Sequence, residues 1–362
     1  MKIPLSSVNL SDLENEYVRD ALSKGWISGT GKYVSLFEEA LCQKLGRGYA
    51  IATANGTLAL ELVLRALDIG EGDEVILPAL TFVAPAAAVK AVGGIPVFAD
   101  ITLTTWTIDP DDVRKKITSK TKAIIAVDLL GHPADYNPLI SFGLPVIEDA
   151  AEAHGAFYYG QPVGTLGVVA IFSFHANKAI TTGEGGCVLT DDASLNQKMR
   201  LLANHGMTKE KPYWHDIVGF NYRMTNLTAA IGLGQVERWD ELVQARNTVA
   251  ETYDHYLRDL PLQRRPIAYW AKEACCLYTT SLDARDEILK HVRAQGIDAR
   301  AIWYSLPDLP LYRASCRGIY TTAQEISRHA MLLPTWSNMP IETIKQVCSS
   351  IERAFKKRRL TY

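Results

Sequence analysis

The sequence predicts an α/β protein whose larger part is a mainly parallel sheet between helices, followed by a smaller α+β domain. Over the first two-thirds of the chain, short apolar runs alternate with helix-like segments, which is typical of a parallel sheet covered on both faces. Near residue 225 this alternation gives way to a helical stretch of more than thirty residues. The strand and helix patterns after it are shorter. We therefore expect two domains, residues 1–240 and 241–362.

The expected strands of the larger domain are short apolar runs, and the last two of them end near an acidic residue or a glycine. These runs are residues 73–79, 95–100, 122–131 and 144–151. Two helix patterns lie among them. Residues 57–70 have an amphipathic repeat that ends at Gly70, and residues 84–94 close on two glycines.

The smaller domain follows a helical pattern at residues 224–260. We expect this pattern to be broken around Gly232 and Gly234, because glycine weakens a helix interior. The remaining elements are strands at 275–283 and 297–303 and helices at 285–296 and from about 341.

Composition narrows the class of protein. The 362 residues are 48% hydrophobic and 22% charged, as in an ordinary globular protein, and the net charge of -2 gives no reason to expect a nucleic-acid or membrane partner. The six cysteines show no CxxC spacing and are expected to be reduced. Because the chain shows neither a signal-peptide core nor an apolar run of roughly 18–20 residues, we expect a cytoplasmic protein.

Common nucleotide, metal and hydrolase motifs do not fit the chain. The "GTGK" of residues 29–32 lacks the first glycine of a P-loop and has Tyr33 after the lysine. No G-x-G-x-x-G follows a strand, and neither HExxH nor G-x-S-x-G occurs. We expect no metal site.

Three features suggest a cofactor site. Asp149 ends an expected strand, where ligands of parallel sheets bind, although a helix cap or a surface acid is an alternative. Gly56 and Thr57 begin a helix whose free N–H groups attract anions, and a plain helix cap is the alternative. Lys178 lies between an aromatic stretch and a glycine-rich turn; it is either an exposed loop residue or an amine able to form a Schiff base, which a partly buried cationic pocket promotes.

Taken together, the three features describe a site for pyridoxal phosphate. That cofactor needs a lysine for its aldehyde, an acid opposite its pyridine nitrogen and donors for its phosphate. The sequence supplies all three in workable order.

Long stretches along the whole chain resemble the sugar aminotransferases of the DegT/DnrJ/EryC1/StrS family, which have the aspartate aminotransferase fold (type I of the pyridoxal phosphate enzymes). The stretches are "WISGTGKYVSLFEEAL", "NGTLAL", "PALTFVAPAAAV", "IEDAAEAHGA", "FSFHANKAITTGEGG", "GFNYRMTNLTAAIGLGQVE" and "LPTWSNM". The resemblance implies that Lys178 binds the cofactor and moves protons, and that Asp149 pairs with the pyridinium nitrogen.

The same resemblance implies roles for further residues. Phe82 stacks on the cofactor ring, with a core aromatic as the alternative, and Ser173 joins Gly56 and Thr57 at the phosphate. Asn221 reaches the phosphate of the neighbouring subunit, which implies a homodimer with composite sites.

Five residues have an open role. Glu152 lies near the ring hydroxyl, where many relatives carry glutamine, or is a surface or structural acid. His175 is catalytic or an ordinary packed histidine, and Arg223 meets the substrate diphosphate or forms a structural ion pair. Trp26 and Ser28 border the sugar site or serve the turn.

The resemblance also implies the reaction. L-glutamate converts the cofactor to pyridoxamine phosphate, which aminates a keto-sugar carried on a nucleotide. Two stretches, residues 175–186 and 212–227, are most similar to the members that aminate C4 of GDP-4-keto-6-deoxymannose to GDP-perosamine for surface polysaccharides such as O-antigen. The alternatives are a UDP- or dTDP-linked 4-keto-6-deoxy sugar, another keto-sugar, or a non-catalytic protein that only binds the cofactor.

Overall fold

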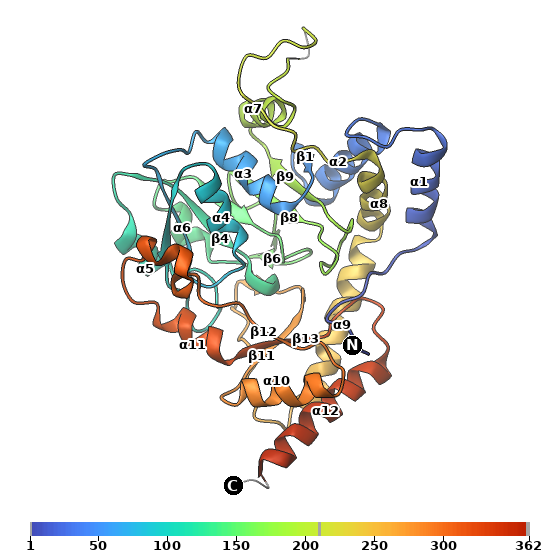
Figure 1. Ribbon diagram of the computed structural model, residues 1–362, viewed down its shortest axis with the longest axis vertical. Coiled ribbons are helices and arrows are strands. Elements are labelled where there is room, and N and C mark those ends of the chain that lie inside the picture. Colours follow the sequence, from blue (N-terminus) through green and yellow to red (C-terminus); the bar gives the residue numbers. More distant parts are fainter. Residues whose placement is uncertain (1, 209–210, 360–362) are drawn as a thin grey trace.

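The computed structural model describes residues 2–208 and 211–359, and its centre is a seven-stranded sheet (Figure 1). The strand order is β1-β9-β8-β5-β4-β2-β3. β9 runs antiparallel to both of its neighbours, and all the other pairs are parallel. The prediction of a mainly parallel sheet between helices is therefore confirmed.

The strands of the central sheet are short and almost entirely buried. They are β1 (Tyr49–Thr53), β2 (Glu74–Pro78), β3 (Ile95–Ala99), β4 (Thr121–Val127), β5 (Val146–Asp149), β8 (Val169–Ser173) and β9 (Gly186–Thr190). A second, antiparallel sheet has the order β11-β13-β12, with β11 (Tyr278–Ser281), β12 (Arg300–Ala301) and β13 (Ala330–Leu333). A third small sheet joins β6 (Phe157–Tyr158), β7 (Gln161–Pro162) and β10 (Ala271–Lys272).

Helices surround the two larger sheets. In chain order they are α1 (Asp12–Ser23), α2 (Lys32–Leu45), α3 (Gly56–Ala66), α4 (Ala84–Ala91), α5 (Pro110–Lys116), α6 (Tyr136–Ile140), α7 (Ala193–Ala203), α8 (Asn226–Glu237), α9 (Trp239–Leu257), α10 (Arg285–Ala294), α11 (Thr321–His329) and α12 (Ile341–Arg359). No helix in this described part of the chain is long and apolar enough to cross a membrane.

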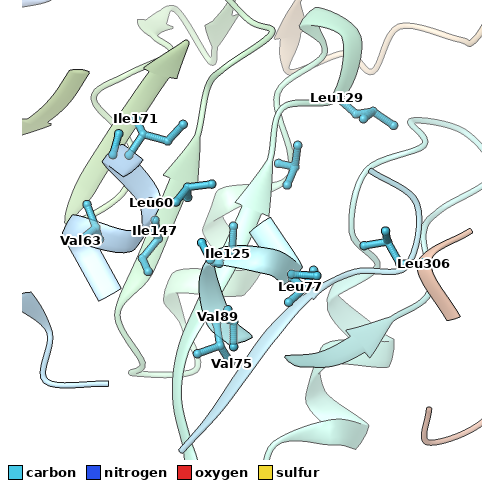
Figure 2. Close-up of a cluster of buried hydrophobic side chains, with 14 of the residues drawn as sticks. Leu60, Val63, Val75, Leu77, Val89, Ile125, Leu129, Ile147, Ile171 and Leu306 are labelled. Carbon is cyan, nitrogen blue, oxygen red and sulfur yellow. The ribbon is translucent and has the colours of Figure 1, made fainter. Parts of the chain in front are cut away.

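The central sheet is apolar on both faces, as its buried strands require. On one face, Leu60 and Val63 of α3 and Val89 of α4 pack against Ile125 and Ile147 of the sheet (Figure 2). On the other face, side chains of α2 and α8 pack against alternate residues of β1, β8 and β9. Full burial of each such side chain contributes about 1.5–3 kcal/mol, so this double covering fixes where the strand ends lie.

The smaller unit has a core of its own. Helices α9, α10 and α12 pack on the second sheet, at the lower end of the molecule in Figure 1. Ile3 joins this core from the opposite end of the chain, and its N–H donates to the carbonyl of Gly296 at 3.1 Å. The division at residue 240 stays a prediction.

Two predicted helix boundaries are wrong. The helix expected to end at Gly70 ends at Ala66, because Asp68 already has a left-handed φ of 58°. The long helical pattern breaks at Arg238, between α8 and α9, and not at its glycines.

The two glycines have a packing role in α8. A Cβ on Gly232 would lie 2.7 Å from the Phe37 ring of α2, and one on Gly234 would lie 2.9 Å from the Glu14 side chain of α1. Glycine is needed there so that the neighbouring helices can approach closely.

Gly131 offers a test of how the two units are joined. Its φ is +92°, its carbonyl accepts the N–H of Ala274 at 3.1 Å, and an added Cβ would lie 1.6 Å from the Ala274 oxygen. We expect Gly131→Ala to destabilise the protein by about 3 kcal/mol or more, because strain and a backbone clash add.

Gly143 is the matched control, since it has a φ of +72° and open space around it. Gly143→Ala should cost only about 1 kcal/mol. Thermal denaturation of both variants checks this, and equal losses would contradict the close approach at Gly131.

Candidate active site

A cavity of about 640 Å³ opens at the carboxyl ends of β5 and β8 and the start of α3. Arg300 and Trp303 border it from the side of the smaller unit. Eight of the predicted site residues line it: Gly56, Thr57, Phe82, Asp149, Glu152, Ser173, His175 and Lys178. The structure therefore brings eight of the predicted residues together around one cavity, and their roles stay predictions.

Asp149 is the buried acid of this cavity. It is the last residue of β5, is 4% exposed, and accepts one hydrogen bond, from the N–H of Ala151 at 3.1 Å. Burial raises the pKa of Asp149 to about 7, with the Ala151 N–H opposing, the charge of Glu152 adding to the rise and Lys178 opposing it. The alternative of a surface acid is excluded.

Glu148, one residue earlier, shows how a buried acid is normally satisfied. It points to the other face of β5, where its carboxylate accepts the N–H groups of Gly164, Leu166 and Gly167. Asp149 lacks such a set, so its carboxyl group is available to a ligand.

Lys178 is buried rather than exposed on a loop. Its side chain is 11% exposed, and its amine lies 3.1 Å from Oε1 of Glu152. The other oxygen of Glu152 accepts the N–H of Leu130 at 3.0 Å. The surroundings of the Lys178 amine are therefore acidic, and they are not the cationic pocket that would favour its neutral form.

This acidic neighbour decides the charge of the amine. Burial lowers the pKa of Lys178, but the charge of Glu152 and its hydrogen bond raise it by more, so the net shift is upward. Glu152 thus holds Lys178 as an ammonium ion and lies within reach of its protons.

The start of α3 provides an anion site. Asn55 caps the helix by accepting the N–H of Leu58 at 2.9 Å, and Gly56 and Thr57 occupy the first helical positions beside the cavity. A Cβ on Gly56 would lie 3.0 Å from that of Ser173. The helix cap is confirmed, and because a capped helix start is also a positive end that attracts anions, the phosphate site stays a prediction that the cap does not contradict.

The mouth of the cavity contains side chains that the sequence argument missed. The ring of Trp303 lies edge-on to Phe82, which is 51% exposed, with centroids 6.2 Å apart. Arg300 is held by Asp298, which accepts its Nε and Nη2 at 3.0 and 2.7 Å. Both Arg300 and Trp303 lie in a run interpreted only as a strand, and no local motif indicated them.

Asn177 and Glu184 were missed within the lysine stretch itself. His175 is half exposed, its Nδ1 lies 2.9 Å from Oδ1 of Asn177, and its Nε2 lies 3.8 Å from Glu184. It is therefore a cavity residue and not a packed histidine.

The four remaining predicted residues, Trp26, Ser28, Asn221 and Arg223, lie outside this cavity. The carbonyls of Trp26 and Ser28 both accept hydrogen bonds from Asn226, at the start of α8. Arg223 lies beside them, since a Cβ on Gly29 would be 3.0 Å from its Nε.

Asn204 links the other two of these residues. It forms a β-bridge with Asn221, and its Oδ1 accepts from Arg223 at 2.6 Å. The four residues thus gather around one separate surface, and their roles stay predictions.

The described residues include no cluster of His, Cys, Asp and Glu that could hold a metal ion.

The chain matches the model of the DegT/DnrJ/EryC1/StrS aminotransferase family over residues 9–352. It is 37% identical to GDP-perosamine synthase of Escherichia coli O157:H7 in an alignment that covers 98% of each chain. It is 39% identical to GDP-perosamine synthase of Caulobacter vibrioides, over 97% of this chain and 98% of the relative.

The fold is similarly shared. The structure of Spr1654 from Streptococcus pneumoniae, solved in PLP and PMP forms, superposes with a TM-score of 0.91 and 28% identity. The match covers 98% of this chain and 99% of that one.

The raised pKa of Asp149 predicts a trade-off between stability and binding. Without cofactor, the carboxyl group is more easily charged in the unfolded chain, at its ordinary value of 3.8, than in the folded one, at about 7. This group therefore removes stability as pH rises from about 4 through about 7. Asp149→Asn should stabilise the cofactor-free protein at pH about 8 by up to about 4 kcal/mol, and by progressively less toward pH about 5.

Thermal melts of cofactor-free protein across this pH range check the prediction, with the exposed Asp283→Asn as the control. Parallel curves for wild type and Asp149→Asn would show that this carboxyl group is not desolvated.

Proposed function

The chain belongs to the DegT/DnrJ/EryC1/StrS aminotransferase family, and from this premise we propose that it aminates the C4 keto group of GDP-4-keto-6-deoxy-D-mannose to give GDP-perosamine, with L-glutamate as amino donor. The observation that carries the choice of sugar is full-length identity of 37% and 39% with two GDP-perosamine synthases. The match spans 98% of the length of both relatives.

The cavity fits pyridoxal phosphate, the cofactor on which this family depends. Asp149 is a buried carboxyl group with one donor, and a pyridinium N–H would supply the second donor and the opposite charge. Gly56, Thr57 and Ser173 would hold the phosphate at the positive end of α3. Lys178 is the amine that would bind the aldehyde, and Phe82 borders the same space.

When bound, the cofactor supplies an electron-withdrawing ring that stabilises negative charge on the adjacent substrate carbon. Asp149 would keep the ring nitrogen protonated, which strengthens this effect. The Lys178 amine would act first as a base and then as an acid. It would move a proton between the substrate carbon and the cofactor carbon.

Glu152 can take part in the proton transfers of Lys178. Its Oε1 lies 3.1 Å from the Lys178 amine and its other oxygen is fixed by the Leu130 N–H. We therefore assign it the task of receiving a proton from Lys178 and holding the amine in position, instead of a surface role.

We further propose that the protein is a homodimer with composite sites. Asn221, Trp26 and Ser28 are exposed and gather with Arg223 outside the cavity of their own subunit. Exposed apolar side chains occur in the same stretches of the chain, with Ile27 50% exposed and Val218 83% exposed. Large exposed apolar groups of this kind are typical of an interface, and a partner would bring Asn221 to the phosphate and Arg223 to the substrate diphosphate.

The location proposed for this enzyme is the cytoplasm. The support is that all six cysteines are free thiols, four of them buried, as a reducing compartment maintains them.

Product analysis tests the substrate. Purified protein loaded with pyridoxal phosphate is mixed with L-glutamate and, separately, with GDP-4-keto-6-deoxymannose and the UDP- and dTDP-linked 4-keto-6-deoxyglucoses. Mass spectrometry should find an amino sugar only on GDP. The Lys178→Ala variant is the control and should form none; amination of a UDP or dTDP sugar alone would overturn the choice of nucleotide.

Mixing two inactive variants tests the composite site. Lys178→Ala removes the amine, and Asn221→Asp should repel the phosphate of the neighbouring site. In a mixed dimer one site then regains both native residues, so refolding the two together should restore about a quarter of wild-type activity. No recovery beyond the average of the two variants would place Asn221 in the site of its own subunit.

A further inference from the structure

Arg246 of α9 is a buried cation without an acidic partner. Its side chain is 2% exposed, the largest of the fully buried side chains. Three other arginines are similarly buried, and each forms an ion pair: Arg47 with Asp191, Arg265 with Glu273 and Arg285 with Asp286. Among the described residues, Arg246 has no such pair, and its Nε has no hydrogen-bond partner.

An isolated buried charge costs folding free energy. Its presence at Arg246 therefore indicates a role other than stabilising the fold. Burial lowers the pKa of Arg246, with the nearby thiols of Cys276 and Cys275 opposing. An arginine starts from so high a value that it stays charged. The interior beneath the cavity therefore contains a permanent positive charge.

The contacts of Arg246 converge on the lysine of the site. Nη2 donates to the backbone carbonyl of Lys178 at 2.8 Å, and Nη1 donates to the carbonyl of Cys276. A longer contact of 3.4 Å reaches the hydroxyl of Ser6. One side chain thus joins the lysine loop, the segment before β11 and the N-terminal segment.

Lys178 is consequently held at both ends. Arg246 fixes its peptide carbonyl, and Glu152 accepts its amine at 3.1 Å. Glu152 favours the ammonium form of the amine, whereas a like charge such as that of Arg246 would disfavour it. Burial lowers the pKa of His154 well below its usual value, and the charges of Lys178 and Arg246 lower it further. Both cations therefore act on the same buried imidazole ring.

The charge of the amine matters for the covalent step. Lys178 must first lose a proton, for which Glu152 is the adjacent acceptor; its lone pair then forms the C–N bond with an aldehyde carbon, and the aldehyde oxygen leaves as water. Three titratable groups act directly on the charge of the amine: Glu152, Cys276 and Asp149. His154 and Arg246 belong to the same buried set, because the charges of Lys178 and Arg246 both act on His154 and on Cys276. Arg246 is the one that is positive at every working pH.

We propose that Arg246 is a positioning residue for Lys178: it fixes the lysine backbone and places behind it a permanent charge that favours the uncharged amine. The inference rests on the proposed use of pyridoxal phosphate. Through Arg246, helix α9, which connects the two units of the chain, directly positions the reacting lysine.

The test is a titration of the loaded protein. Wild type, Arg246→Gln, Arg246→Met and Arg246→Lys are loaded with pyridoxal phosphate, and the visible absorbance of the bound cofactor is followed against pH. Its midpoint reports the proton on the Lys178 nitrogen. Both neutral variants should raise the midpoint by about one pH unit, a tenfold change in the fraction without the proton. Arg246→Lys, which keeps the charge, should stay close to wild type.

Arg285→Gln is the matched control. Arg285 is also buried and donates to two backbone carbonyls, those of Ser327 and Ala330, but makes no contact with the lysine loop. It should lower the thermal midpoint by a similar amount without moving the absorbance midpoint.

The result that overturns the role of Arg246 is an unshifted midpoint in the neutral variants, or an equal shift in Arg246→Lys. A purely structural role would reduce the amount of bound cofactor and leave the midpoint in place. Wild type that takes up no pyridoxal phosphate would instead overturn the proposed function itself, and the inference with it.

Discussion

Three buried carboxylates, Glu148, Asp149 and Glu152, lie at or just after the end of β5. The geometry of the site depends on how each of these carboxylates is hydrogen-bonded or paired with a cation. Glu148 accepts three backbone N–H groups from one loop. Glu152 accepts the amine of Lys178 and the N–H of Leu130. Asp149 receives a single N–H, and a cationic ring nitrogen would complete its environment. Because an unpaired buried charge is costly, these three arrangements determine where the lysine and the cavity floor lie and where the cofactor ring would bind.

The smaller unit is part of the same site. Its residues Arg300 and Trp303 border the cavity, and the chain before β11 lies against Gly131, directly after Leu130. Arg246 joins that chain to the carbonyl of Lys178. A change in how the two units pack would therefore move the lysine and the cavity mouth together, and the aminotransferase chemistry proposed for the large sheet depends on contacts made from outside it.

The sequence predicted the features that follow from local pattern. Apolar runs located β2, β3 and β5, and strand-end and helix-start positions identified Asp149 and Gly56. It could not predict features set by distant contacts. Arg246 reads as one charged residue in a helix, and its burial depends on segments 68 and 30 positions away in the chain. The same is true of Gly232, which reads as a helix breaker until Phe37 is known to pack against it.

The central claim is that Lys178 is the residue that binds the cofactor. Reduction of the loaded protein with borohydride would fix the cofactor to its lysine, and peptide mapping by mass spectrometry would then locate the added mass. The label should lie on Lys178 alone and should be absent from Lys178→Ala. A label on any other lysine, or an unchanged label in that variant, would contradict it.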